Sequence, residues 1–357
     1  MKIKNSNYKK NLDLSVLIKT ISSSFIILSF FYMMPIFIKF SDENYLNKKI
    51  FKNDSQKILT YTLNNNFENN SDEIYHNEIY GEKDLLDDIL KLNNLEEDSV
   101  RLNFSDIKKL FEDVDYKLSD VRKYKLVKPV ALSWLPHEIK SIDNIKYKKE
   151  LFIQIILPLI LEENNNIRLD RKKLFTILNK SKNSDLELKW LEKKYKQYGI
   201  PSKDLSTLKI RMDEIPVSLA IAQSAKETGW GSSRFALEGN ALFGQWTWSG
   251  EGLKPQYRDE NKEHEVMKFN VLQASVRAYH RNLNTHPSYH NFRLSRAELR
   301  DQGKSLDSLI LSEDLKDYAE TGYEYVEKIK KIIIQNNLKD FDDVQLMPSS
   351  NNLESLI

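Results

Sequence analysis

Glu227 stands at the predicted end of a helix, in surroundings that favour a protonated carboxyl group. Apolar residues at helical spacing predict that helix, namely Val217, Ala220, Ile221 and Ala225, and Pro216 suits its first turn. Gly229 and Gly231 follow at once, so the helix should end near Thr228 and leave Glu227 in its last turn. The negative end of the helix dipole and shielding from water by Trp230 both disfavour a carboxylate, so we expect a raised pKa for Glu227. A carboxylic acid that keeps its proton near neutral pH is what cleavage of a glycosidic bond requires.

A second set of acidic residues lies between two predicted strands. Aromatic and polar residues alternate over residues 245–248, a glycine-rich turn follows at 249–252, and alternation resumes over 264–269. This pattern predicts a small antiparallel hairpin. Its acidic residues are Asp259, Glu260, Glu263 and Glu265. Glu265 leads directly into the returning strand and Glu263 falls on the same strand face, whereas a solvated turn is the alternative for most of these acids.

The rest of the chain has mainly helical patterns. A strongly apolar helix is predicted over residues 146–161, which Pro158 should bend or end, and further helices over 171–180 and 185–198. After the hairpin, helical spacing returns over residues 270–283 and 322–336. Together these elements predict an α+β fold that is mostly α-helical, with one small β-hairpin lobe.

An uncharged apolar run over residues 20–38 is long enough to cross a bilayer, and basic residues precede it. We interpret residues 1–40 as a cytoplasmic tail and an uncleaved signal-anchor transmembrane helix. A cleaved signal peptide and a buried core helix are the alternatives; no clear cleavage site is visible, and the flanking lysines argue against a core helix. The leading basic cluster favours a single-pass protein of the cell membrane whose catalytic domain is exported to the periplasmic or extracellular face, although further lysines follow the run.

Composition narrows the function classes. The formal net charge is +2 and charges of both signs are interspersed, so no nucleic-acid partner is indicated. The chain has no cysteine, which excludes disulfides and cysteine-ligated metals, and its histidines have no metal-binding spacing, so we expect no metal and no cofactor. Beyond the anchor, the expected organisation is a polar spacer at 41–104, a helical N-terminal subdomain at 105–200, a catalytic domain at 201–345 and a tail at 346–357.

Two strings around Glu227 resemble a known family. A-K-E-T-G-W-G at residues 225–231 and N-A-L-F-G at 240–244 resemble the signature of the bacterial glucosaminidase family that includes the flagellar muramidase and many autolysins. The resemblance runs from Asp213 past Tyr289 and implies a lysozyme-like fold with Glu227 as the catalytic acid. Upstream, F-I-x-x-I-L-P-L-I-L-x-E-N at 152–164 is similar to the Bax-type glucosaminidases of bacterial envelopes. A lone glutamate at a helix end is ordinarily a solvated charge, so these strings are what make Glu227 a catalytic candidate.

The resemblance also implies further site residues. The family carries its second carboxylate in the lobe, where Glu265 and Glu263 are the candidates, and it places a tyrosine that matches Tyr289 near the scissile bond. Sugars bind to aromatic platforms with polar edges, so we expect substrate contacts from Trp230, Asn240, Phe243, Trp246, Trp248 and Tyr279. Core packing is the alternative for each aromatic residue.

The resemblance implies a peptidoglycan hydrolase that cleaves the β-1,4 bond after N-acetylglucosamine in glycan strands; the sequence does not reveal its protein partners. Water activated by a lobe carboxylate and attack by the substrate's own acetamido group both remain open for the second half of the reaction. A lytic transglycosylase-type muramidase is one alternative, since it needs only one acid. A catalytically silent, membrane-anchored wall-binding scaffold is the other.

Overall fold

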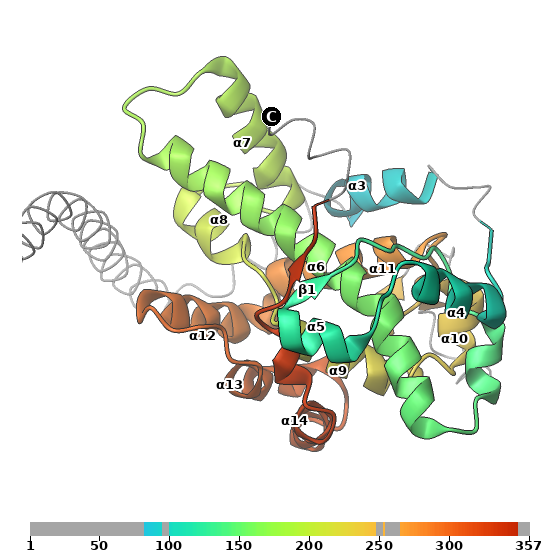
Figure 1. Cartoon of the computed structure of the whole chain (residues 1–357). Coiled ribbons are helices and arrows are strands. Elements are labelled where there is room, and N and C mark those ends of the chain that lie inside the picture. Colours follow the sequence, from blue (N-terminus) through green and yellow to red (C-terminus); the bar gives the residue numbers. More distant parts are fainter. Residues whose placement is uncertain (1–81, 95–99, 248–252, 254–264, 349–357) are drawn as a thin grey trace, which may run out of the picture. The chain divides into compact units, whose positions relative to one another are not determined.

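The computed structural model describes residues 82–94, 100–247, 253 and 265–348 (Figure 1). The chain divides into two compact units, Met1–Phe67 and Glu68–Ile357, and all the described residues fall in the second. Residues 1–40, the expected anchor, lie outside the described part. Among the described helices, none combines the length and the apolar character that crossing a bilayer demands.

The described elements are mostly helical, as the sequence predicts. In chain order the first are α3 (Glu82–Asn94), α4 (Phe104–Asp113), α5 (Leu118–Tyr124), β1 (Leu126–Val127), η1 (His137–Ser141), α6 (Ile145–Leu178), α7 (Asp185–Gln197), α8 (Leu205–Arg211), α9 (Val217–Thr228) and α10 (Arg234–Gly239). They are followed by β2 (Trp246–Thr247), β3 (Glu265–Val266), α11 (Leu272–Thr285), η2 (Pro287–Tyr289), α12 (His290–Asp301), α13 (Ser308–Leu311), η3 (Ser312–Tyr318), α14 (Tyr323–Gln335), η4 (Leu338–Phe341) and β4 (Gln345–Leu346).

Helix α9 lies at the centre of the main core, in contact with α6, α13, α14 and η4. Its small and branched residues Ala220, Ile221 and Ala222 are fully buried, which lets neighbouring helices approach closely. The start of α9 is capped from far along the chain, because the carboxylate of Asp342 accepts hydrogen bonds from both the backbone N–H and the hydroxyl of Ser218, each at 2.8 Å. The helix that carries Glu227 is therefore held by its core contacts and by a cap at its start.

Helix α6 continues through Pro158 over 34 residues, so of the two predicted effects of this proline, a bend or an end, the end was wrong. Proline has no N–H and leaves the carbonyl of Gln154, four residues earlier, without its helical donor. The hydroxyl of Tyr116 donates to that carbonyl at 3.1 Å, and the Gln154 amide donates back to the Tyr116 carbonyl at 2.9 Å. The surrounding fold thus replaces the bond that the proline removes.

The C-terminal half of α6 packs with α7 and α8 around a second apolar cluster, beside the main core (Figure 1). Ile167, Leu174 and Ile177 supply the α6 side of this cluster. Helix α7 begins with a full capping box, in which the Ser184 and Glu187 side chains each pair with the other's backbone N–H. We call α7, α8 and this half of α6 the arm.

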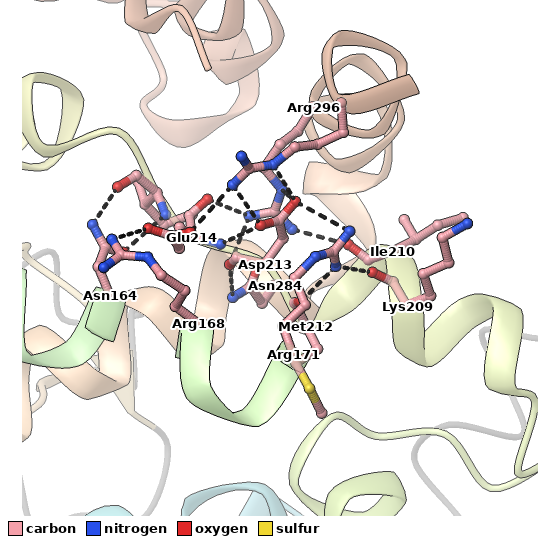
Figure 2. A network of polar contacts seen from close by, with 12 residues as sticks. Asn164, Arg168, Arg171, Lys209, Ile210, Met212, Asp213, Glu214, Asn284 and Arg296 are labelled. Atoms are coloured by element: carbon pink, nitrogen blue, oxygen red, sulfur yellow. Dashed lines mark hydrogen bonds and ion pairs between the residues drawn. The ribbon is translucent and has the colours of Figure 1, made fainter. Parts of the chain in front are cut away.

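The arm and the main core meet at a buried ion cluster around Asp213, between α8 and α9 (Figure 2). The Asp213 carboxylate lies 3.0 Å from Arg300, 3.7 Å from Arg171 and 3.9 Å from Arg296. Burial alone would raise the pKa of Asp213, but the guanidinium groups of Arg171, Arg296 and Arg300 outweigh it and lower that pKa to about 2. The Asp213 carboxylate therefore bridges α6 of the arm and α12 of the core, and Glu214 bridges the same two helices through Arg168 and Arg300.

Two short sheets complete the fold. Strands β2 and β3 are antiparallel, with Trp246 opposite Val266 and Thr247 opposite Glu265, which confirms the predicted hairpin. Strands β1 and β4 are parallel, so residues 345–346 at the end of the described chain pair with residues 126–127.

Helix α3 lies in the range expected as spacer, yet it packs onto α11 and α7. Ile89 is only 1% exposed, and Arg281 of α11 donates to the Leu85 carbonyl and pairs with Asp88 at 3.0 Å. Residues 82–94 are therefore part of the packed unit, and a spacer can extend no further than about residue 81.

Candidate active site

The turn after α9 fixes where Glu227 points. The helix ends at Thr228, as predicted, and the next three residues, Gly229, Trp230 and Gly231, all have positive φ, at 57°, 59° and 82°. Glycine adopts this region freely, whereas a tryptophan there is strained and needs support. Support comes from the Trp230 N–H, which donates to the Ala225 carbonyl at 3.0 Å. The chain therefore turns sharply away and leaves Glu227 at the helix end.

The Glu227 carboxyl group is half-buried. Burial raises its pKa, against the opposing effects of the neighbouring Lys226 and of a hydrogen bond from Tyr325, so the expected direction of the shift is confirmed. A methyl group added at Gly244, where φ is +62°, would lie 3.4 Å from Glu227 Oε2. The backbone of the N-A-L-F-G element thus forms one wall beside the acid, and a side chain at this position would crowd the carboxyl group.

Trp230 packs edge-on against Phe152, with ring centroids 6.0 Å apart, and the ammonium of Lys149 lies 4.8 Å above its ring. It remains partly exposed. The sequence led us to expect that Trp230 shields Glu227, whereas the neighbours that the structure places at the carboxyl group are Gly244 and tyrosines. Trp230 therefore keeps exposed surface and stays a candidate for sugar contact.

Three tyrosines gather around Glu227: Tyr289 from η2, Tyr318 from η3 and Tyr325 from α14. Their rings form a continuous row, with centroids 5.9 Å apart between Tyr289 and Tyr318 and 5.4 Å apart between Tyr318 and Tyr325. Burial raises the pKa of all three hydroxyls, that of Tyr289 to about 12, so they stay protonated in the pH range of a hydrolase. Sequence reasoning found Tyr289 and missed the other two.

The lobe begins immediately beside the acid, because Gly244 precedes β2 by a single residue, Gln245. The Gln245 carbonyl accepts a hydrogen bond from the Met267 N–H at 2.8 Å, which holds the two strands together at their base. Glu265 is the first residue of β3, as predicted, and is 6% exposed. Glu263 and Trp248 lie outside the described residues, and of Trp246 the structure describes the backbone pairing alone.

Three residues expected to contact sugar are buried instead. Asn240 is 0%, Phe243 2% and Tyr279 0% exposed. The Asn240 amide donates to the carbonyls of Ser133 and Phe269, each at 3.2 Å, and so ties two segments together at the base of the lobe. Phe243 stacks face to face on Tyr279, with centroids 3.9 Å apart. We therefore assign these three residues to the support of the site, because a side chain without exposed surface cannot bind a glycan.

No group of three or more His, Cys, Asp or Glu side chains within the described residues is arranged to hold a metal ion. The chemistry that the described groups can perform is proton transfer from a half-buried acid, with protonated tyrosines as hydrogen-bond donors around it. Glycoside hydrolases use such an acid to protonate the leaving oxygen, so the described groups define a candidate glycoside hydrolase site.

Comparison with known proteins agrees with this class. Residues 205–338 match the Glucosaminidase family model, described as mannosyl-glycoprotein endo-beta-N-acetylglucosaminidase, and the matched region includes Glu227, Glu265, Tyr289 and Tyr325. The chain is also similar to Protein bax of Escherichia coli (strain K12), with 32% identity over 184 residues. That match takes in 50% of this chain and 66%, slightly under two thirds, of the relative. No solved structure matches the chain. The resemblance drawn from the sequence is thereby confirmed, and a glycoside hydrolase activity is supported.

Proposed function

We propose that the chain is a peptidoglycan hydrolase that cleaves the β-1,4 bond after N-acetylglucosamine in glycan strands. The observation that carries this proposal is the placement of Glu227, at the end of a rigid buried helix, half-buried, with a raised pKa. The family match supports a glycan substrate. In this reaction Glu227 protonates the oxygen of the leaving sugar, which requires its protonated form.

The second half of the reaction has two routes. In one, Glu265 of the lobe activates a water molecule; in the other, the acetamido group of the substrate attacks the anomeric carbon. Glu265 is one of the two predicted lobe carboxylates, and it lies in β3, paired with Thr247 of β2. Its role depends on how near the hairpin brings it to the sugar.

Product analysis tests the activity itself. Purified peptidoglycan digested with the protein should yield fragments with a reducing N-acetylglucosamine end, detected by mass spectrometry. An anhydro-muramic end would instead identify a lytic transglycosylase. Binding without cleavage would identify a scaffold. Either result contradicts the proposed hydrolysis.

Replacing Glu265 with glutamine should lower turnover much more than substrate affinity if this carboxylate activates water, because the loss falls on the transition state. The Glu263→Gln variant is tested in parallel, and Glu298→Gln, an exposed change on α12, serves as the control. The measurement is kcat and KM on soluble glycan fragments. Wild-type turnover in both lobe variants would exclude the water route through these carboxylates and favour the acetamido route.

We also propose that residues 1–40 anchor the protein in the cell membrane and that the catalytic region lies on the exported face. The uncharged run up to Ile38 supports this. The full-length protein should remain with membranes after a high-salt wash and be released by detergent. A truncated chain that begins at Gly81 keeps α3 and should appear in the soluble fraction. Release of the full-length protein by salt alone would contradict the anchor.

A further inference from the structure

Gln223 lies one helical turn before Glu227 on α9 and is completely buried. Residues four apart share a helix face, so its amide lies on the same side of α9 as the acid. A buried amide needs partners for both its N–H and its carbonyl groups. Both partners are tyrosines: the Tyr279 hydroxyl donates to Gln223 Oε1 at 2.7 Å, and Gln223 Nε2 donates to the Tyr325 hydroxyl at 3.0 Å.

These hydrogen bonds all point in one direction. The oxygen of Tyr325 accepts from Gln223, so the Tyr325 proton is free to point toward the Glu227 carboxyl group, whose pKa a hydrogen bond from Tyr325 lowers. The chain of donors therefore runs from Tyr279 through Gln223 and Tyr325 to Glu227. If the amide were reversed, the Tyr325 proton would turn to Gln223 and Glu227 would lose this donor.

Packing holds each member of this relay in place. Tyr279 is stacked on Phe243, with rings 3.9 Å apart and 9° from parallel. Tyr325 is stacked on Tyr318, with rings 5.4 Å apart and 15° from parallel. The Tyr318 hydroxyl donates to the Phe243 carbonyl at 2.9 Å, which links the two stacks. The relay is therefore pre-organised before any substrate binds.

We propose that Gln223 is a positioning residue for the hydrolysis proposed above: acting through Tyr325, it determines which oxygen of Glu227 carries the catalytic proton. In a protonated carboxyl group the carbonyl oxygen is the better hydrogen-bond acceptor, so the oxygen that accepts from Tyr325 is the carbonyl oxygen and the proton resides on the other. The remaining groups that act on Glu227 are Lys226 on α9, Tyr289 in η2 and Tyr318 in η3. None of these is bonded to Gln223 in the described part of the chain, so a change at residue 223 reaches the acid through Tyr325.

The Gln223→Met variant tests this role, because methionine keeps the length of the side chain and removes both hydrogen-bonding groups. With the amide N–H gone, the Tyr325 oxygen can accept a proton from Glu227, which favours the protonated acid. We expect kcat to fall by about tenfold, which corresponds to the loss of one hydrogen bond in the transition state, and KM to stay nearly unchanged. The alkaline limb of the pH profile, where activity falls as Glu227 loses its proton, should move to higher pH.

Two further variants keep the test decisive. Tyr279→Phe removes one hydroxyl and frees the amide to reverse, so it should change kcat and the pH profile in the same manner, and it covers the case in which Gln223→Met does not fold. Ser224→Ala is the matched control, since Ser224 is buried on the same helix and its hydroxyl has no partner among the described residues. A wild-type kcat and pH profile in folded Gln223→Met and Tyr279→Phe proteins would overturn the relay.

A measurement without turnover separates the relay from the proposed function. In full-length protein with ¹³C-labelled glutamate side chains, the signal absent from Glu227→Gln reports the Glu227 titration by NMR. Gln223→Met should raise this titration midpoint, and Ser224→Ala should leave it unchanged. If the wild-type protein fails to cleave peptidoglycan but the midpoint still moves, the relay holds and hydrolysis fails. An unmoved midpoint in an active enzyme refutes the relay alone.

Discussion

Replacing Glu227 with glutamine is expected to lower glycan cleavage by about 10²–10⁴-fold, the usual contribution of a general acid. Glutamine has nearly the same shape and can still accept from Tyr325, but it cannot donate a proton to the leaving oxygen. The α9 core is untouched by the change, so the variant should fold and still bind wall fragments. The measurements are the initial rate of peptidoglycan digestion and retention of the protein on insoluble wall material.

The pH profile of the wild-type enzyme checks the same assignment. Burial raises the pKa of Glu227, and the acid works only while protonated, so activity should fall as the pH rises through that pKa. Glu298→Gln on the exposed face of α12 is the control and should digest at the wild-type rate. A folded Glu227→Gln protein that digests peptidoglycan as fast as wild type would falsify the proposed mechanism.

The second large effect is expected at Asp213, on stability. The Asp213→Asn change leaves the guanidinium groups of Arg171 and Arg296 without their counter-charge, and leaves Arg300 with Glu214 alone. Removing one partner from a buried ion cluster typically costs about 3–5 kcal/mol. Urea unfolding followed by circular dichroism measures this loss as a fall in the free energy of unfolding.

Acid should act on the same cluster. Because the folded-state pKa of Asp213 is lowered to about 2, its stabilising contribution is complete above the ordinary value near 3.8 and is lost as the pH falls from there toward 2. The matched control is Glu238→Gln, which breaks an exposed pair with Arg234 within α10 and should cost about 0.5 kcal/mol or less. Equal stability of Asp213→Asn and Glu238→Gln would show that the cluster does not hold the arm to the core.

Local signals in the sequence were sufficient to predict those parts of the site whose structure depends on residues close together along the chain. The two glycines after Thr228 end α9 where predicted, and alternating residues before Gly250 and after His264 form the hairpin ladder. Gly229 and Gly231 both have the positive φ that makes glycine informative. The position of Glu227 followed from these signals alone.

The features that sequence reasoning missed depend on residues far apart in the chain. Tyr325 reaches the acid because α14 packs on α9, and its bond to Gln223 spans 102 residues. The aromatic residues near the start of the last helix were a visible signal, but nothing local shows which of them faces the acid. Helix α6 passes through Pro158 because Tyr116, 38 residues before Gln154, supplies the missing donor.

Motif resemblance also misplaced residues whose role is support. Asn240 and Phe243 belong to the N-A-L-F-G string, and Tyr279 was chosen as an aromatic residue; neither signal shows whether a side chain is exposed. Their burial places them beneath the site, where Asn240 adopts a positive φ of 51° to turn the chain after α10.

The Asp342 cap on α9 has a consequence for how the protein comes to fold. Ser218 and Asp342 are 124 residues apart, so the helix that carries the acid cannot gain this cap until Asp342 itself has left the ribosome. Contacts of such long range slow the final step of folding. A chain interrupted before residue 342 would contain the complete A-K-E-T-G-W-G string, but the first turn of its helix would lack the Asp342 cap. Glu227 therefore reaches its final position only late in synthesis.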